Sequence, residues 1–69
     1  MHKEFEVHLL NEQGIEKANQ LAKIFDLALT GIEVLAGTGG REMSIVRTKL
    51  EEASFFAKKA MAILPENQR

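Results

Sequence analysis

The chain has 69 residues, a net charge of −1 at pH 7 and no cysteine. A chain this short forms one small domain whose core supplies at most about 3–5 kcal/mol, and without cysteine it has no disulfide frame and no thiolate metal site. We therefore expect oligomerisation to supply the missing stability. The charge balance argues against binding to duplex nucleic acid, which needs a surplus of Lys and Arg.

The first ten residues alternate weakly between apolar and polar side chains, with Phe5, Val7 and Leu9 as the apolar members. This alternation predicts an extended arm, residues 1–10, whose order depends on a partner surface. The arm lacks the apolar core of a signal peptide, and no apolar run in the chain approaches the ~20 residues that a membrane span needs. We expect no membrane association and a location in the cytoplasm.

Both histidines, His2 and His8, lie on this arm. A zinc site there would require them to converge with Glu4 or Glu6. Solvated or partner-facing histidines are the favoured alternative, given the ligand set that zinc requires. We therefore expect neither a metal nor a cofactor.

The first helix is predicted over residues 11–36. Asn11 suits the N-cap position, and Glu12 suits the first turn, where a carboxylate complements the helix dipole. One row of small and apolar residues, with steps of three and four, comprises Ile15, Ala18, Ala22, Phe25, Leu29, Ile32 and Ala36, and a second comprises Leu21, Ile24, Ala28, Gly31 and Leu35. One row provides a hairpin seam, whereas the other requires a further partner.

The glycine-rich segment 37–40 separates the two predicted helices. Gly37 is placed for a left-handed residue at the end of the first helix, and Thr38 or a following glycine can cap the second. So short a connection favours antiparallel neighbours. Glycine-rich turns also bind anions, but this one lacks the Gly-Lys-Ser/Thr ending and the preceding strand of a nucleotide-binding loop, so a plain turn is favoured.

The second helix is predicted over residues 41–64, with Pro65 ending it and a polar tail, residues 66–69, that we expect to fray. Its seam row comprises Met43, Val46, Leu50, Ala53, Ala57, Ala60 and Leu64. Phe55 and Phe56 lie outside this row and are expected to meet other protomers. The sequence thus predicts one all-α domain over residues 1–69: an antiparallel two-helix hairpin with a short N-terminal arm, assembling into a homo-oligomeric helical bundle.

No group of residues has the pattern of a catalytic site, so we expect a protein that is not an enzyme. Glu51 and Glu52 are adjacent and point to different sides of a helix, which excludes an acid/base pair. Glu51 follows Arg47 by four residues, a spacing that predicts an ordinary surface ion pair.

Seven cations are carried by the helices: Lys17 and Lys23 on the first, and Arg41, Arg47, Lys49, Lys58 and Lys59 on the second. In an oligomer, such side chains from neighbouring protomers can converge on phosphate oxygens. The alternative is a solvated outer face, which spacing by itself favours.

The second helix carries a recognisable signature: Arg41-Glu42 and Ser44, then residues 48–53 with the sequence TKLEEA, then Ala57, Ala60 and Ala62. It resembles the small phage and prophage hairpin family that includes the anti-CBASS cyclic-nucleotide sponges, and the same hairpin resembles part of the larger anti-Thoeris sponges. The first helix is similar through Ile15, Lys17, Ala18, Leu21 and Ala22, so the likeness covers about residues 5–62.

This resemblance implies a protein that sequesters cyclic di- or trinucleotide messengers between protomers of a compact oligomer, commonly a hexamer. It would block bacterial antiphage signalling in the host cytoplasm without cleaving the messenger. The rival hypothesis is a structural or protein-binding hairpin that only mediates oligomerisation.

The resemblance also implies roles for individual residues. Lys17 is similar to the helix-one lysine of the sponges, with Lys23 as the alternative if the register differs. Arg41 and Thr48 fall within the signature and either contact phosphate or tie protomers together. Val7 stands where the family's arm has a stacking tyrosine, so Phe5 or His8 must take that role.

Overall fold

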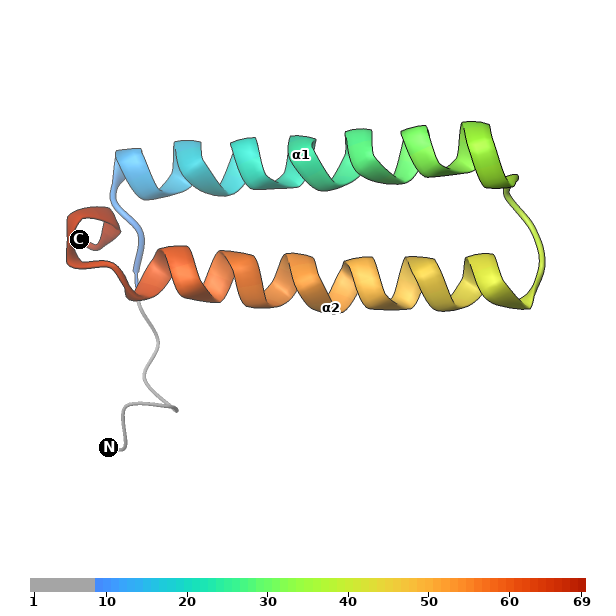
Figure 1. The fold of residues 1–69 in the computed structure, drawn as a ribbon. Coiled ribbons are helices and arrows are strands. Elements are labelled where there is room, and N and C mark those ends of the chain that lie inside the picture. Colours follow the sequence, from blue (N-terminus) through green and yellow to red (C-terminus); the bar gives the residue numbers. More distant parts are fainter. Residues whose placement is uncertain (1–8) are drawn as a thin grey trace.

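The computed structural model describes residues 9–69, most of which lie in two long helices (Figure 1). Helix α1 spans Glu12–Ala36, α2 spans Arg41–Ile63, and a short 3-10 helix, η2, spans Pro65–Asn67. The two long helices lie side by side and run antiparallel. The predicted all-α hairpin is confirmed for the described residues, whose only β-type pairing is an isolated bridge between Leu10 and Gln68.

Helix α1 begins where Asn11 caps it. The Asn11 side-chain oxygen accepts a hydrogen bond from the Gly14 N–H at 2.7 Å, which satisfies one of the donors that a helix start leaves unpaired. Glu12 occupies the first turn. The predicted N-cap is therefore confirmed, and the helix starts one residue after the expected boundary.

The connection between the helices uses two glycines with positive φ. Gly37 has φ 87° and donates its N–H to the Glu33 carbonyl at 2.8 Å, and Gly40 has φ 96° and is the N-cap of α2. Residues with a Cβ rarely adopt such angles, so glycine is required at both positions. The chain thereby reverses within four residues, and α2 returns along α1.

The seam between the helices differs in part from the predicted row. Met43, Val46, Leu50 and Ala57 are buried or half-buried, as expected, whereas the predicted members Ala53, Ala60 and Leu64 are exposed. Half-buried Ser54 and buried Met61 take part instead. Both sets follow a heptad spacing, and the sequence pattern cannot choose between them because alanine is acceptable on either side of the seam.

The α1 side of the seam also differs from the predicted rows. Half-buried residues there are Lys17, Ala18, Leu21, Phe25, Leu29, Ile32 and Glu33, so the seam combines members of both predicted rows. The remaining apolar members, including Ile15 and Ile24, face outward.

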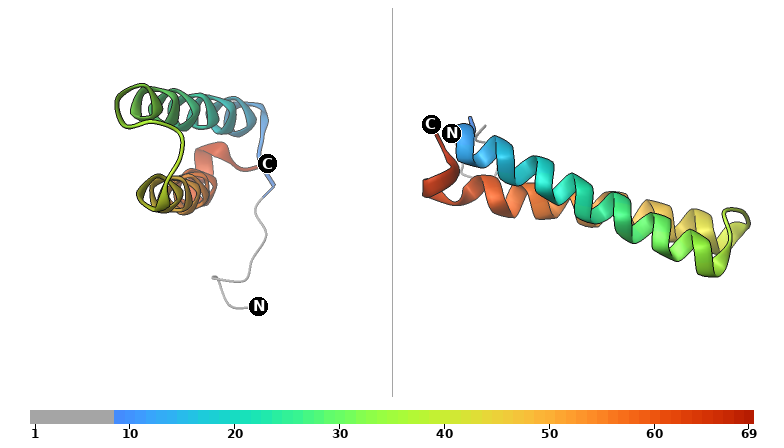
Figure 2. Two further views of the ribbon diagram at one scale, coloured as in Figure 1. Left: turned by 90° about the vertical axis from the view of Figure 1, so that its right-hand side faces the viewer. Right: turned by 90° about the horizontal axis from the view of Figure 1, so that it is seen from above.

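The hairpin is one helix thick, and its Cα atoms extend only 11 Å along the shortest axis (Figure 2). No third layer covers either face, so among residues 9–69 the buried side chains are few: Met43, Met61 and Asn67. Large apolar side chains remain largely exposed, with Val34 at 80% and Leu35 at 89%. A two-helix layer cannot enclose a core by itself.

The end where α1 begins and α2 finishes is closed by a polar clasp, made of residues 9–11 and 66–69. The Asn11 amide donates to the Glu66 carbonyl at 2.9 Å and to the Gln68 carbonyl at 3.2 Å. Main-chain bonds join Asn11 N–H to the Asn67 carbonyl and Arg69 N–H to the Leu9 carbonyl, both at 2.9 Å. The prediction of a frayed tail is therefore wrong.

The tail is ordered because its polar side chains complete the end of α2. Asn67 is fully buried and donates to the Met61 carbonyl at 2.9 Å, and Gln68 donates to the Ala62 and Ile63 carbonyls at 2.9 and 3.0 Å. The Met61 carbonyl also accepts from the Leu64 N–H at 3.2 Å, whereas the Ala62 and Ile63 carbonyls have no other partner among the described residues, so Gln68 satisfies two acceptors that a simple helix end exposes to water.

Candidate functional site

One concave surface contains two of the predicted site residues, Arg41 and Thr48. They lie two helical turns apart on one face at the start of α2, and together with Ser44, Ile45 and Lys49 they line a shallow pocket of about 340 Å³. We call this the Arg41 pocket. Ser44, Ile45 and Lys49 were not among the predicted site residues, although their spacing from Arg41 and Thr48 places them on the same helical face.

The pocket combines charge, hydroxyl groups and an apolar side chain. Arg41 is exposed and makes no ion pair with any other residue in the range 9–69, and Lys49 pairs only weakly with Glu52, at 3.8 Å between largely exposed side chains. Both cations can therefore meet an anion from outside the hairpin at little cost. Ile45, which is 41% exposed, offers an apolar contact beside them.

The two hydroxyl groups of the pocket are held by their own helix. Ser44 donates to the Gly40 carbonyl at 3.2 Å, and Thr48 donates to the Ser44 carbonyl at 3.0 Å. Each hydroxyl oxygen keeps acceptor capacity, and each proton can rotate toward another acceptor. The pocket thus offers two fixed cations and two adaptable hydroxyls within two helical turns.

Arg47 lies close to this pocket in sequence but has a different role. Its guanidinium donates to the Glu33 carboxylate at 3.1 Å and to the Thr38 carbonyl, and its side chain is 32% exposed. The predicted ion pair with Glu51 is therefore wrong, because the antiparallel register brings Glu33 to Arg47 and the half-buried site favours that partner. Arg47 ties the turn to both helices.

The remaining predicted site residues lie away from the Arg41 pocket. Lys17 is half-buried in the second turn of α1 and Lys23 is exposed one turn and a half further on. Because the helices are antiparallel, most of α1, roughly 28 Å at ~1.5 Å per residue, separates Lys17 from the turn. Phe5, Val7 and His8 lie outside the described residues. A single hairpin does not bring the helix-one lysines to Arg41.

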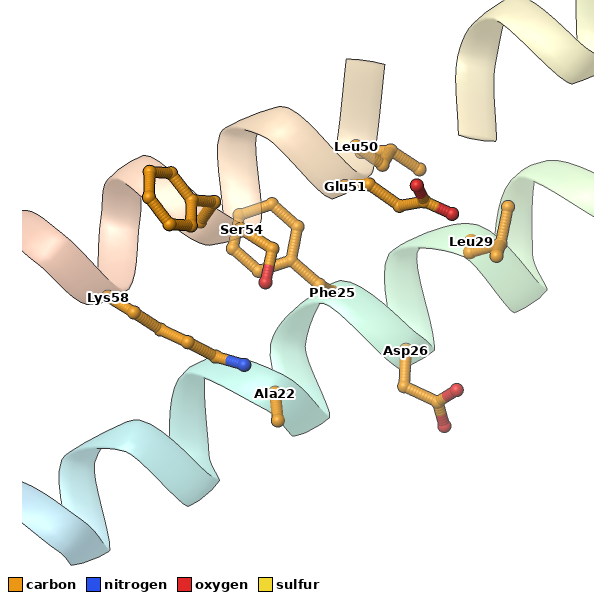
Figure 3. Close-up of a pocket in the computed structure, with 9 residues that line it drawn as sticks. Ala22, Phe25, Asp26, Leu29, Leu50, Glu51, Ser54 and Lys58 are labelled. Atoms are coloured by element: carbon orange, nitrogen blue, oxygen red, sulfur yellow. The ribbon is translucent and has the colours of Figure 1, made fainter. Parts of the chain in front are cut away.

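A second concave surface lies midway along the hairpin (Figure 3). Apolar side chains of both helices and three charged groups line this mid-hairpin groove: Ala22, Phe25, Asp26, Leu29, Leu50, Glu51, Ser54, Phe55 and Lys58. Figure 3 shows Lys58 toward one end of the groove with Ala22, and Glu51 and Asp26 toward the other. The two ends therefore carry opposite charge.

An exposed apolar row follows the outer side of α1 from its middle to the turn. Its large members are Ile24, Leu27, Val34 and Leu35, with exposed fractions from 59% to 89%. Gly31 lies between them, and a Cβ added there would meet nothing within 4 Å. No Lys or Arg occurs between Ile24 and Leu35, and the two carboxylates in that range lie elsewhere, Asp26 in the mid-hairpin groove and Glu33 in the pair with Arg47, so this row is apolar.

Within residues 9–69, no group of three or more His, Asp or Glu side chains is arranged to hold a metal ion. No helix in that range is long and apolar enough to cross a membrane. Comparison with known proteins adds no relative: no family model, curated protein or solved structure matches the chain.

Proposed function

We propose that this protein is a homo-oligomeric sponge that binds cyclic di- or trinucleotide messengers between protomers and does not cleave them. In this role it would block bacterial antiphage signalling in the host cytoplasm. The observation that carries the proposal is the Arg41 pocket, where two cations, two hydroxyls and an exposed apolar side chain lie on one helical face. Phosphate oxygens, ribose hydroxyls and bases require these groups.

The size of the pocket favours a site shared between protomers. Its volume of about 340 Å³ is near the lower limit for small-molecule pockets, and it is open on the outside. A ligand with two or three nucleotides would leave much of its surface in water unless a second protomer covered it. Lys17 or Lys23 can contribute to the same ligand only from another hairpin, because both lie far from Arg41 along α1.

The exposed apolar side chains supply a driving force for assembly. Fully burying a Val, Leu or Ile side chain contributes about 1.5–3 kcal/mol. Ile24, Leu27, Val34 and Leu35 are each more than half exposed. Their burial against other protomers would supplement a core that contains few fully enclosed residues.

Binding without cleavage is consistent with the chemistry of the pocket. Arg and Lys side chains donate hydrogen bonds and stabilise negative charge, but they provide no acceptor that takes a proton from an attacking hydroxyl. The two hydroxyl groups have no neighbouring base among the residues lining the pocket. The ligand would therefore be recovered intact when the protein is denatured.

Isothermal titration calorimetry against a panel of cyclic di- and trinucleotides tests the proposal. We expect binding by the wild type, and a weakening of roughly tenfold or more for Arg41→Ala, since a charge-assisted contact contributes about 1.5–3 kcal/mol. Arg69→Ala is the matched control, because it removes the same charge at the opposite end of the hairpin. Absence of binding to every member of the panel at high micromolar concentration would reject the proposal, as would conversion of the nucleotide.

The rival function is a structural or protein-binding hairpin, and the outer row of α1 favours it. That surface contains no cation to receive a nucleotide, yet it exposes four large apolar side chains. Mass measurements on the Arg41→Ala variant separate the two functions. A sponge loses ligand affinity and keeps its mass, whereas a scaffold in which Arg41 bridges protomers loses its assembly.

A further inference from the structure

We infer that the mid-hairpin groove binds a second copy of this hairpin about a twofold axis, with Lys58 of each protomer facing Glu51 and Asp26 of the other. The inference rests on the homo-oligomer of the proposed function and assigns one of its interfaces. The groove lies on the middle of the hairpin, away from the turn, and its Glu51 is one helical turn beyond Thr48 of the Arg41 pocket.

The charged groups of the groove are not neutralised by residues 9–69 of the same hairpin. Lys58, Glu51 and Asp26 form no ion pair with any described residue. Arg47, four residues before Glu51, is held by Glu33, and Lys49 pairs with Glu52. Lys58 and Glu51 are seven residues apart on one helix, about 10 Å along its axis, so they do not meet each other.

The same spacing makes the surface complementary to itself. In a twofold interface, residue i of one protomer contacts residue j of the other and the reverse contact is also made. An axis through the midpoint between Glu51 and Lys58 exchanges their positions when the two α2 helices cross antiparallel. Two ion pairs then form, and each Lys58 also approaches the Asp26 that lines the acidic end of the groove.

The residues at that midpoint suit the centre of an interface. Ser54 and Phe55 occupy it, and Phe55 is 63% exposed. Phe55 packs edge-to-face against Phe56, with 5.3 Å between ring centroids, so its orientation is already restricted before association. Aromatic side chains are enriched at interface centres, and a small residue beside them permits close approach of the helices.

These features favour a second copy over an unrelated partner. The groove has one basic end and one acidic end, so it binds a surface whose charges run in the opposite order. A second copy of the groove, rotated by 180°, presents its charges in that order. An unrelated acidic or basic partner would leave one end facing like charge, which opposes binding.

Charge reversal tests the inference through the mass of the full chain in sedimentation equilibrium. The dissociation constant of the assembly should rise roughly tenfold or more for Lys58→Glu and for Glu51→Lys, because each places like charges together twice in the interface. The triple variant Asp26→Lys, Glu51→Lys and Lys58→Glu exchanges all three groove charges and should restore the wild-type constant to within about threefold. Lys59→Glu is the matched control, since it reverses the neighbouring charge outside the groove and should change the constant by less than about threefold.

Other outcomes overturn the inference. A monomeric mass for the wild type at micromolar concentration would show that no second copy binds the groove. Equal effects of Lys58→Glu and Lys59→Glu assign the change to net charge, and failure of the triple variant to recover shows that Lys58 does not face Glu51 and Asp26. Circular dichroism of each variant confirms that the helices are intact.

The outcome is separable from that of the proposed function. If the protein binds nucleotide but the Lys58→Glu variant assembles to the same mass as the wild type, only this interface is rejected. A charge-sensitive assembly that binds no nucleotide rejects only the sponge.

Discussion

Polar groups are paired with one another at the end of the hairpin where α1 begins and α2 finishes, in residues 9–11 and 66–69. At the turn end, by contrast, the described residues leave cations and apolar side chains open to solvent. Met61 and Asn67 are buried at the closed end, while Val34 and Leu35 near the turn are almost fully exposed. The polar groups of the clasp are thus satisfied within the hairpin, whereas the turn end leaves open the surface that the proposed function would use.

The largest effect on stability is expected at the clasp, from Asn11→Ala. This change removes the N-cap bond from the Gly14 N–H and both side-chain bonds to the tail. The Glu66 and Gln68 carbonyls then lose the hydrogen bonds that the Asn11 amide donates. We expect a loss of about 2–3 kcal/mol in the free energy of unfolding, measured by urea denaturation. Asn19→Ala, on an exposed part of α1, is the matched control and should change it by less than about 0.5 kcal/mol. Equal effects of the two variants would show that the clasp does not stabilise the fold.

Two glycines of α1, Gly14 beside the clasp and Gly31 nearer the turn, allow the two ends to be compared by the same substitution. A Cβ at Gly14 would lie 2.4 Å from the Asn67 main-chain oxygen, whereas a Cβ at Gly31 would meet nothing within 4 Å. Gly14→Ala should therefore destabilise the protein by about 1–2 kcal/mol despite the higher helix propensity of alanine. Gly31→Ala should stabilise the monomeric hairpin by about 0.5–1 kcal/mol.

The two glycine variants are compared by thermal unfolding, with mass measured in parallel. Opposite shifts in Tm are expected. If Gly31→Ala lowers both Tm and mass, the outer row of α1 is a close helix contact in the assembly. If both variants shift Tm upward, the close approach of the tail to Gly14 is not present in solution.

The smallest of the three destabilising effects is expected at the turn, from Arg47→Ala. The variant loses the bonds to Glu33 and Thr38, in a site that is partly exposed, so we expect a loss of about 1 kcal/mol. Lys49→Ala removes a cation whose pair with Glu52 is long and exposed, and its effect should be near zero. Chemical denaturation of both variants under identical conditions measures the difference, and equal losses would contradict the assigned role of Arg47.

Local signals in the sequence were sufficient for the helices and the turn. Asn11, the glycines of segment 37–40 and Pro65 mark helix boundaries through backbone chemistry that depends on a few neighbouring residues, and the observed boundaries fall within one residue of those predicted. That Arg41 and Thr48 share a helical face was also predictable, since residues seven apart lie on the same side of a helix.

Longer-range features were not predictable in the same way. Whether Ala53 or Ser54 faces α1 depends on how the two helices rotate against each other, and the pattern of alanines permits both. The partner of Arg47 was misassigned because Glu33 is distant in sequence and becomes adjacent only in the antiparallel register. The tail appeared free because its bonds run to backbone carbonyls, which carry no sequence signature.

The sequence by itself determined an all-α hairpin, its caps and its turn, because these follow from propensity, capping and glycine conformation over short stretches. Only the tertiary structure decided which apolar rows are covered, that the polar tail closes the end of α2, and that Lys58 and Glu51 remain unpaired among the described residues. These features depend on the rotation and register of one helix against the other, which are set by packing across the whole seam and not by any local pattern.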